Sequence, residues 1–376
     1  MEPTSVAGKR IAACAAPVAA DAERSPETAQ SVISVYEDEV PPFVAAEMEL
    51  LYENIFSSVV KVTLDGNKKV SAYVVHKDGK VVTVFLFRRK KGLVEVLNEV
   101  MAIDDDDICR FADTIFSSYA TATVISFHAV RSAIRMLPYR YQSFNCLEDI
   151  VLTLPATPQD YFSSLGKNMR ASITRYTKKL EKNFPSFSYQ VDTKADVSEQ
   201  DVRDIIRLSS ARMRVKNQVS LHDETKTAQL IQLVKMHGLL AVARIDGRVC
   251  AGVICSRFGA NYFMHVIAHD PQYDEFRLGK LCCYRSICEC IKRGGKEFHF
   301  LWGRYEYKYR LLGVQRELEH VAVYRSGAQL LLNCNMVFKN AFKGYGRQLK
   351  RWVLDPRRAR TFIARLANWF LNRRSH

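Results

Sequence analysis

The sequence predicts a mixed α/β fold in two units, followed by a basic helical tail. The chain has 376 residues with 48% apolar content, which exceeds the usual size of one compact domain. Helical and strand periodicities alternate from Glu47 to Phe300, so helices and strands are mixed along the chain. The net charge is +15, and residues 336–376 hold eleven Lys and Arg against one acidic residue. We therefore expect a mildly basic body and a strongly basic end.

The first forty-two residues are expected to form a disordered leader. They mix Ala, Pro, Ser and Glu without periodicity and end at Pro41-Pro42, so folding should begin near Phe43. No run of eighteen apolar residues occurs, which argues against a membrane span. The ten cysteines include no Cys-x-x-Cys pair, so we expect reduced thiols in a cytoplasmic protein.

Two clusters could suggest a metal, and both have a simpler explanation. Cys282, Cys283, Cys288 and Cys290 fall in one predicted helix, where small apolar side chains pack easily into a core. The run Asp104 to Asp107 precedes a predicted helix, where carboxylates cap backbone N–H groups. We therefore expect no metal site.

The first unit, residues 43–157, reads as helices and strands in alternation. Its hairpin turns at Lys77-Asp78-Gly79, because Asp-Gly tolerates the positive φ of a tight turn. The predicted elements are a helix at 47–56, hairpin strands at 70–76 and 80–87, a helix at 108–117, and strands at 124–127 and 150–154.

The second unit, residues 158–328, shows a similar order. Thr157-Pro158 should open its first helix, and a long basic helix follows. The predicted elements are helices at 167–182, 199–214 and 225–237, hairpin strands at 239–245 and 249–257, and a strand at 261–268. The echo between the two halves suggests two units of similar topology.

The segment from Asp270 to Leu311 holds the predicted chemistry. The loop Arg277-Leu278-Gly279-Lys280 leads into an amphipathic helix that ends at Gly294-Gly295, and a strand at 297–302 follows. The start of a helix presents free N–H groups at its positive dipole end, so it can bind a pyrophosphate. Arg277 and Lys280 would add counter-charge.

These features resemble the GNAT acetyltransferases linked to cellulose and exopolysaccharide biosynthesis and, more distantly, the FemABX peptidyltransferases. The resemblance rests on the Arg-rich helix at 165–181, the hairpin at 241–255, Asp270-Pro271 followed by Gly279, and Gly303 with Tyr307-Lys308. It implies two tandem GNAT-like units, the first degenerate and the second binding acetyl-CoA as acyl donor. The donor-binding residues it implies are Arg277, Gly279, Lys280 and Leu281. Leu281 departs from the family pattern, which has a small residue there.

Acyl transfer from a thioester needs a base for the acceptor and an acid for the departing thiolate. We expect Asp270 or Glu306 as base and Tyr307 or Tyr305 as acid. Glu306 could equally pair with a neighbouring Arg at the surface, and alternation in a strand would place the tyrosines on one side for packing. His265 and His269 are expected to be ordinary hydrogen-bonded residues. No nucleophile motif is evident, so direct transfer is predicted.

Several cations are candidates for binding anionic groups. Lys308 or Arg304 could bind an anionic part of donor or acceptor, and Arg170 and Arg175 could contact the acceptor. The alternative for the two arginines at 170 and 175 is ordinary solubility of a charged helix face.

The predicted function is acyl-CoA-dependent N- or O-acetylation of an amino sugar or polysaccharide precursor. One alternative is a FemABX-like transferase that uses aminoacyl-tRNA. Another is a catalytically silent scaffold of a membrane glycan-export complex. The sequence does not predict the acceptor's identity or the oligomeric state.

The tail, residues 329–376, is predicted to be helical and amphipathic on both sides of Pro356. Its apolar positions are Phe338, Phe342, Leu349 and Trp352 before the proline, and Phe362, Leu366, Trp369 and Phe370 after it. We expect peripheral contact with an anionic inner-membrane surface. The alternative is packing of the apolar faces against the body. Nucleic-acid binding is not expected, because the aromatic residues fall at helical spacing.

Overall fold

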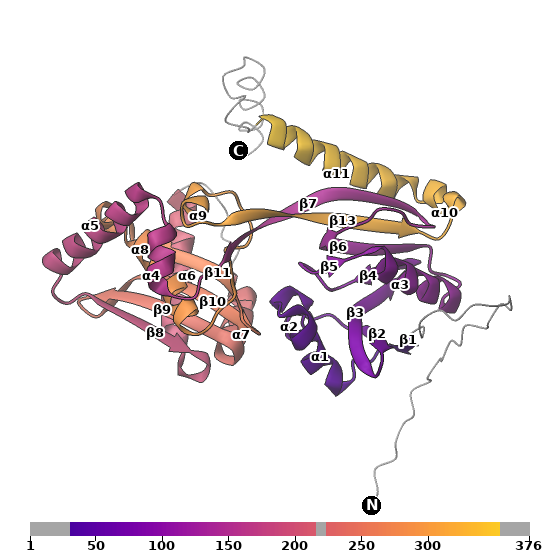
Figure 1. Ribbon diagram of the computed structural model, residues 1–376, viewed down its shortest axis with the longest axis horizontal. Helices are drawn as coiled ribbons and strands as arrows, with labels where there is room; N and C mark the ends of the chain where they lie inside the picture. Colours follow the sequence, from indigo (N-terminus) through magenta and orange to yellow (C-terminus); the bar gives the residue numbers. More distant parts are fainter. Residues whose placement is uncertain (1–30, 216–222, 354–376) are drawn as a thin grey trace, which may run out of the picture. The chain divides into compact units, whose positions relative to one another are not determined.

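The computed structural model describes residues 31–215 and 223–353, which divide into two compact units (Figure 1). Among the described residues, the first unit contains residues 31–40, Lys69–Leu147 and residues 317–353. The second contains Pro41–Lys68 and Glu148–Arg316. The sequence-based boundaries, 43–157 and 158–328, treat each unit as one continuous stretch, whereas residues 43–68 and 148–157 belong to the second unit and residues 317–328 belong to the first. Long-range strand pairing decides this division, and residue periodicity does not reveal it.

The first unit is a mixed sheet covered by a helix. Its strands follow the order β1-β2-β3-β4-β6-β13-β7, with β4 parallel to β6 and β5 parallel to β6 at the side. The strands are β1 (Ser31–Tyr36), β2 (Ser71–Lys77), β3 (Lys80–Lys90), β4 (Leu93–Val96), β5 (Ala102–Ile103), β6 (Val124–Ser132), and parts of β7 (Arg140–Thr153) and β13 (Val314–Tyr324). The predicted hairpin at Asp78-Gly79 is confirmed.

Helix α3 (Asp105–Ser118) closes the core of this unit. Asp104 accepts a hydrogen bond from the Asp107 N–H, so the predicted capping role of the acidic run is confirmed. Phe111 on this helix packs edge-on against Tyr73, Phe85 and Phe127 of the sheet. The helix therefore buries one aromatic face on the strands.

Residues 31–36 of the expected disordered leader instead form β1, which pairs antiparallel with β2 along its whole length. The sequence of β1, Ser-Val-Ile-Ser-Val-Tyr, lacks the strict alternation of apolar and polar residues that predicts a half-buried strand. Residues 1–30 lie outside the described part of the chain. The first helix, α1 (Pro42–Tyr52), begins five residues earlier than predicted, with Pro42 in its first turn.

The second unit is a six-stranded arrangement in the order β7-β12-β11-β10-β9-β8, and β11 and β12 are parallel. Its strands beyond β7 are β8 (Ser188–Thr193), β9 (Gly238–Ile245), β10 (Arg248–Phe258), β11 (Asn261–His269) and β12 (Glu297–His299). Its helices after α1 are α2 (Val59–Leu64), α4 (Pro158–Ser164), α5 (Lys167–Asn183), α6 (Glu199–Val215), α7 (Glu224–His237), α8 (Leu278–Lys292) and α9 (Glu306–Arg310), with 3-10 turns at η1 (Ile55–Ser57), η2 (Lys194–Asp196) and η3 (Pro271–Phe276).

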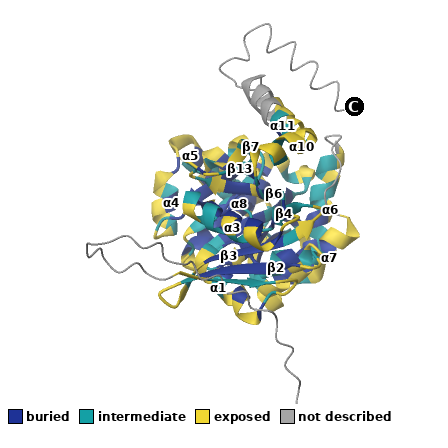
Figure 2. Ribbon diagram, turned by 90° about the vertical axis from the view of Figure 1, so that its right-hand side faces the viewer, coloured by how far each residue is buried: buried dark blue, intermediate teal, exposed yellow. Residues whose placement is uncertain are grey.

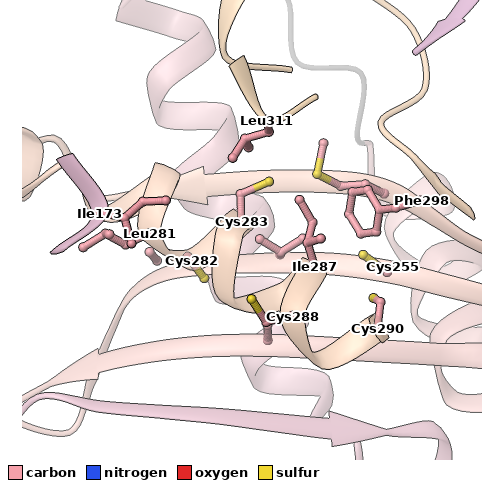
Figure 3. Packing of buried hydrophobic residues seen from close by; sticks show 14 of the residues in the cluster. Ile173, Cys255, Leu281, Cys282, Cys283, Ile287, Cys288, Cys290, Phe298 and Leu311 are labelled. Carbon is pink, nitrogen blue, oxygen red and sulfur yellow. The ribbon is translucent and has the colours of Figure 1, made fainter. Parts of the chain in front are cut away.

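Helices cover both faces of this second sheet. Helix α8 packs against β10 with its four cysteines buried, so the predicted core role of these thiols is confirmed (Figure 3). Gly252 of β10 faces α6, because a Cβ atom there would meet the Ile205 side chain at 2.1 Å. Alternation along β10 therefore separates an α8 face from an α6 face.

The predicted fold class, mixed sheets flanked by helices, is confirmed. Helices α10 (Gly327–Leu332) and α11 (Cys334–Val353) form the described part of the predicted helical tail. The predicted amphipathic segment after Pro356 lies outside the described residues. Within the described part of the chain, no helix is long and apolar enough to cross a membrane.

Candidate functional site

A β-bulge in β11 determines which side chains reach the site. Ile254 of β10 pairs with Val266 and Cys255 pairs with Met264, so His265 is an extra residue in β11. Met264 before the bulge belongs to the core beneath α8, and Ile267 after the bulge packs against the same core. The alternation of side chains between the two faces of the sheet thus shifts by one residue at the bulge. As a result, Ile267 and His269 face α8.

Strand β11 also extends beyond the end of β12, its parallel neighbour. Only Asn261–Phe263 pair with Glu297–His299 of β12, while β11 continues to His269. The end of β11 therefore projects past the shorter strand, beside the start of α8. A pocket of 460 Å³ opens there, within the usual range for small-molecule sites.

The pocket walls come from four parts of the second unit. Ile267 and His269 belong to β11, Tyr307 to α9, and Arg212 to α6. The remaining lining residues belong to the turn η3 and the beginning of α8: Pro271, Asp274, Arg277, Gly279 and Lys280. The sequence-predicted residues that the structure brings together here are thus Arg277, Gly279, Lys280 and Tyr307.

Positive charge is concentrated where α8 begins. Arg277 precedes the helix with a left-handed backbone (φ 54°), an uncommon conformation for a residue with a side chain. Burial lowers the pKa of Lys280, and the nearby cations Arg310 and Arg277 lower it further. These side chains and the N-terminal end of the helix dipole favour an anionic ligand.

The close approach of the His269 side chain requires a glycine at position 279. A Cβ atom at this position would stand 2.5 Å from Nδ1 of His269, which is closer than packing allows. The sequence predicts this glycine for the approach of a pyrophosphate. The structure adds that any larger residue would displace the His269 ring from the pocket wall.

His269 and Asp274 form a pair in the pocket wall. Nε2 of His269 lies 2.6 Å from Oδ1 of Asp274, and the His269 Nδ1 atom is buried without a hydrogen-bond partner among the described residues. The Asp274 side chain is largely exposed. The sequence-based interpretation treats His269 as an ordinary hydrogen-bonded residue and overlooks Asp274, because their pairing depends on the fold of η3.

Lys308 has a different environment from the one predicted. Its Nζ donates hydrogen bonds to the carbonyls of Phe300 (2.8 Å), Leu301 (3.0 Å) and Trp302 (2.5 Å), and the residue is 2% exposed. Burial lowers its pKa to about 8. The three bonds fix a turn in which Leu301 has a φ of 55°. We expected an anion-binding cation, and the structure instead gives Lys308 the geometry of a positioning residue.

The two carboxylates predicted as bases do not line the pocket. Asp270 caps η3 by accepting from the Gln272 N–H at 3.0 Å. Glu306 is exposed and lies 2.6 Å from Arg310, as in the surface-pair alternative. Carboxylates in these settings satisfy local helix geometry.

Tyr307 and Tyr309 lie on α9, and Tyr305 is the residue that precedes the helix, so the interpretation as an alternating strand is wrong. Tyr307 is half-buried and reaches the pocket. Burial raises the pKa of its phenol, so the hydroxyl stays protonated at neutral pH. Tyr305 stacks on Tyr307 and is itself exposed.

The remaining predicted residues lie outside the pocket wall. Leu281 is buried in the core, so its departure from the family pattern adds no bulk to the pocket. Arg170 donates to the carbonyls of Ser163 and Leu165 at the end of α4, and Arg304 lies 3.7 Å from Glu148. Arg170 is thus bound by local backbone carbonyls, and Arg304 lies near a carboxylate.

Arg175 is connected to the pocket through one tyrosine. Its guanidinium covers the Tyr176 ring at 4.6 Å and donates to the Tyr176 hydroxyl at 2.9 Å. A hydrogen bond from Arg277 lowers the pKa of Tyr176, and the charge of Arg175 adds to this effect. Arg175 therefore belongs to the basic surroundings of the pocket without lining it.

A buried ionic network lies elsewhere in the second unit. Nδ1 of His299 is 2.6 Å from Asp149, and Nε2 is 3.3 Å from Glu297, which also binds Arg316 at 2.5 and 2.9 Å. Although burial opposes it, hydrogen bonds to Asp149 and Glu297 raise the pKa of His299. His299 in turn helps to lower the pKa of Glu297 to about 2. This network joins β7, β12 and β13.

Of the remaining lining residues, Pro271 belongs to the Asp270-Pro271 pair noted in the sequence, whereas Arg212 and Ile267 belong to no motif. Arg212 comes from a helix more than fifty residues earlier in the chain, so only the tertiary fold brings it to the pocket. Among the lining residues that were not predicted from the sequence, only Asp274 has a position that could have indicated it. Asp274 lies five residues after His269 and just before the helix start that contains Gly279. No group of three or more His, Cys, Asp or Glu that could hold a metal ion occurs within 31–215 and 223–353.

Comparison with known proteins agrees with this geometry. Residues 167–309 match the family described as "Acetyltransferase (GNAT) domain". The crystal structure of FemX is similar with a TM-score of 0.58 and 8% identity, covering 79% of this chain and 99% of that one. L-PGS from Bacillus licheniformis gives a TM-score of 0.48 and 12% identity, covering 81% and 97%. A tandem GNAT protein from the clavulanic acid biosynthesis pathway gives 0.36 and 11%, covering 68% and 82%. No curated protein matches this sequence.

 The matched range, residues 167–309, lies inside the second unit, and all nine lining residues, from Arg212 to Tyr307, lie within it. The fold and the family match together identify the chain as an acyltransferase whose second unit carries a GNAT acetyltransferase domain.

Proposed function

We propose that the pocket at the start of α8 binds acetyl-CoA and that the enzyme transfers its acyl group directly to an amine or hydroxyl. The observation that carries the proposal is the 460 Å³ pocket whose wall contains Arg277, Gly279 and Lys280 at the N-terminus of a fifteen-residue helix. A pyrophosphate there would meet free N–H groups, two cations and the positive end of the dipole.

The pocket wall also contains groups suited to proton transfer. In the reaction, the acceptor nitrogen or oxygen bonds to the acyl carbon, the C–S bond breaks, the acceptor loses a proton and the thiolate gains one. Asp274, held by His269, is the carboxylate in the wall that can accept the proton. Tyr307, protonated at neutral pH, can supply the proton to sulfur. Asp270 and Glu306 stay candidates that act from outside the wall.

The acceptor proposed is an amino sugar or a polysaccharide precursor. This choice rests on the resemblance to the cellulose-biosynthesis acetyltransferases, carried by Asp270-Pro271, Gly279 and Tyr307-Lys308. The fold likeness to FemX favours a second candidate, a transferase that takes its acyl group from aminoacyl-tRNA. Such a donor would require a longer basic surface than the one pocket.

Donor binding tests the proposal directly. Acetyl-CoA is titrated into the full chain by calorimetry, and release of free thiol is measured with glucosamine as acceptor. Replacing Arg277 and Lys280 together by Ala should weaken acetyl-CoA binding roughly ten- to thousandfold, because charge-assisted bonds to phosphate are lost. The matched control is Lys178→Ala with Lys182→Ala on α5, which removes the same charge from exposed positions.

The outcomes separate the hypotheses. Equal acetyl-CoA affinity in the parent and in the Arg277 and Lys280 double variant would refute the site. No acetyl-CoA binding, with transfer from aminoacyl-tRNA instead, would favour the second candidate. Binding without thiol release for any amine or hydroxyl acceptor would favour a silent scaffold.

A further inference from the structure

Helix α11 has two contrasting sides. Met336 and Val337 pack with Leu330 of α10 against a cluster formed by Val124, Ala322 and Tyr324 of the first unit. Asn340 is buried, and the Gln142 side chain donates to the Val337 carbonyl at 3.4 Å. One side of α11 therefore already packs against the strands of the first unit.

The other side exposes large apolar side chains. Phe338 is 71% exposed and Phe342 is 82% exposed, and the adjoining Leu331 and Leu332 of α10 are 71% and 76% exposed. Figure 2 shows the same exposure along α10 and the first part of α11. Phe338 and Phe342 are one turn apart, and about 200° around the helix from Asn340 at 3.6 residues per turn. We call Leu331, Leu332, Phe338 and Phe342 the α10–α11 apolar face.

This exposure favours the membrane interpretation of the tail over the packed-helix interpretation for its described part. Packing against the body would bury the phenylalanines, and the body instead receives Met336, Val337 and Asn340. Large apolar side chains exposed this densely, four within residues 331–342, mark an interaction surface more often than scattered single ones do. A further partner is needed to cover them.

Charge indicates which partner. Residues 336–376 contain eleven Lys and Arg and one acidic residue, and Lys339 is exposed beside Phe338. Two copies of such a segment repel each other, which disfavours self-association through this face. An anionic lipid surface attracts the basic residues and accepts aromatic rings at the level of its headgroups.

We propose that the α10–α11 apolar face lies on an anionic membrane surface, with the helix parallel to the bilayer plane. The proposal is independent of the donor pocket, so its failure would leave the proposed function untouched.

The experiment is sedimentation of the full chain with phosphatidylcholine vesicles, with and without phosphatidylglycerol, at low and high salt. The parent should bind only the vesicles that contain phosphatidylglycerol, and high salt should release it. Phe338→Ser with Phe342→Ser should lower the partition coefficient by roughly tenfold for each lost ring. The control is Leu50→Ser with Met136→Ser, whose side chains are 76% and 80% exposed elsewhere, and it should bind as the parent does.

Several results would overturn the proposal. A parent protein that stays in the supernatant, or that binds neutral vesicles equally well, would do so. So would a Phe338 and Phe342 variant that binds normally, or a control that is weakened as strongly as this variant. Light scattering without vesicles provides the last arm: a parent dimer that becomes monomeric in the Phe338 and Phe342 variant would assign the face to a second copy. Circular dichroism checks that each variant is folded.

Discussion

Lys308→Met isolates the role of the buried ammonium group. The substitution keeps a long unbranched side chain and removes the three hydrogen bonds to the carbonyls of residues 300–302. Each hydrogen bond contributes about 1 kcal/mol after its desolvation cost, so unfolding of the second unit should become easier by about 3 kcal/mol. The turn with Leu301 at positive φ would lose the contact that holds it.

Urea unfolding followed by circular dichroism measures this loss. With a slope of about 2–3 kcal/mol per molar urea for a unit of this size, the midpoint should fall by about 1 M. Lys178→Met removes an exposed lysine from α5 and should change stability by less than about 0.5 kcal/mol. Acetyl-CoA affinity at low urea should change little, because Lys308 does not line the pocket.

The pH dependence gives a second measure of the same group. The folded-state pKa of Lys308 is lowered to about 8 from 10.5, so the unfolded chain holds the proton above pH 8 more tightly. Parent stability relative to Lys308→Met should therefore rise between pH 8 and 10.5. An unchanged urea midpoint together with lost donor binding would refute the positioning role and restore the anion-binding one.

Two further predictions concern the ionic network and the base. Glu297→Gln should destabilise the protein by about 2–3 kcal/mol at pH 7, because the pKa of Glu297 is lowered to about 2 and its charge pairs with His299 and Arg316. The difference from the parent should vanish as acid protonates Glu297 between pH 4.5 and about 2, and a difference constant across that range would contradict the assignment. Asp274→Asn should lower turnover by about a hundredfold with acetyl-CoA binding intact, whereas Glu306→Gln and Asp270→Asn should stay within a few-fold. A hundredfold loss in either of the latter two, measured by thiol release, would return the base role to that residue.

The sequence by itself determined the local elements and the helix start at which we propose that the donor binds. Asp78-Gly79 fixed a hairpin, Asp104 a helix cap, and Thr157-Pro158 a helix start, because each acts through the backbone of its nearest neighbours. Arg277, Gly279 and Lys280 were predictable for the same reason, since three residues at one helix start are always close together.

Only the tertiary structure decided how distant residues meet. The bulge at His265 changes the phase of β11, and no periodicity signals one extra residue. Arg212 and Tyr307 reach the pocket from helices far apart in the sequence. Lys308 looked like a free cation beside Tyr307, but the turn at 300–302 surrounds its ammonium group with carbonyls. Burial and long-range hydrogen bonds depend on the whole fold, so local residue patterns cannot specify them.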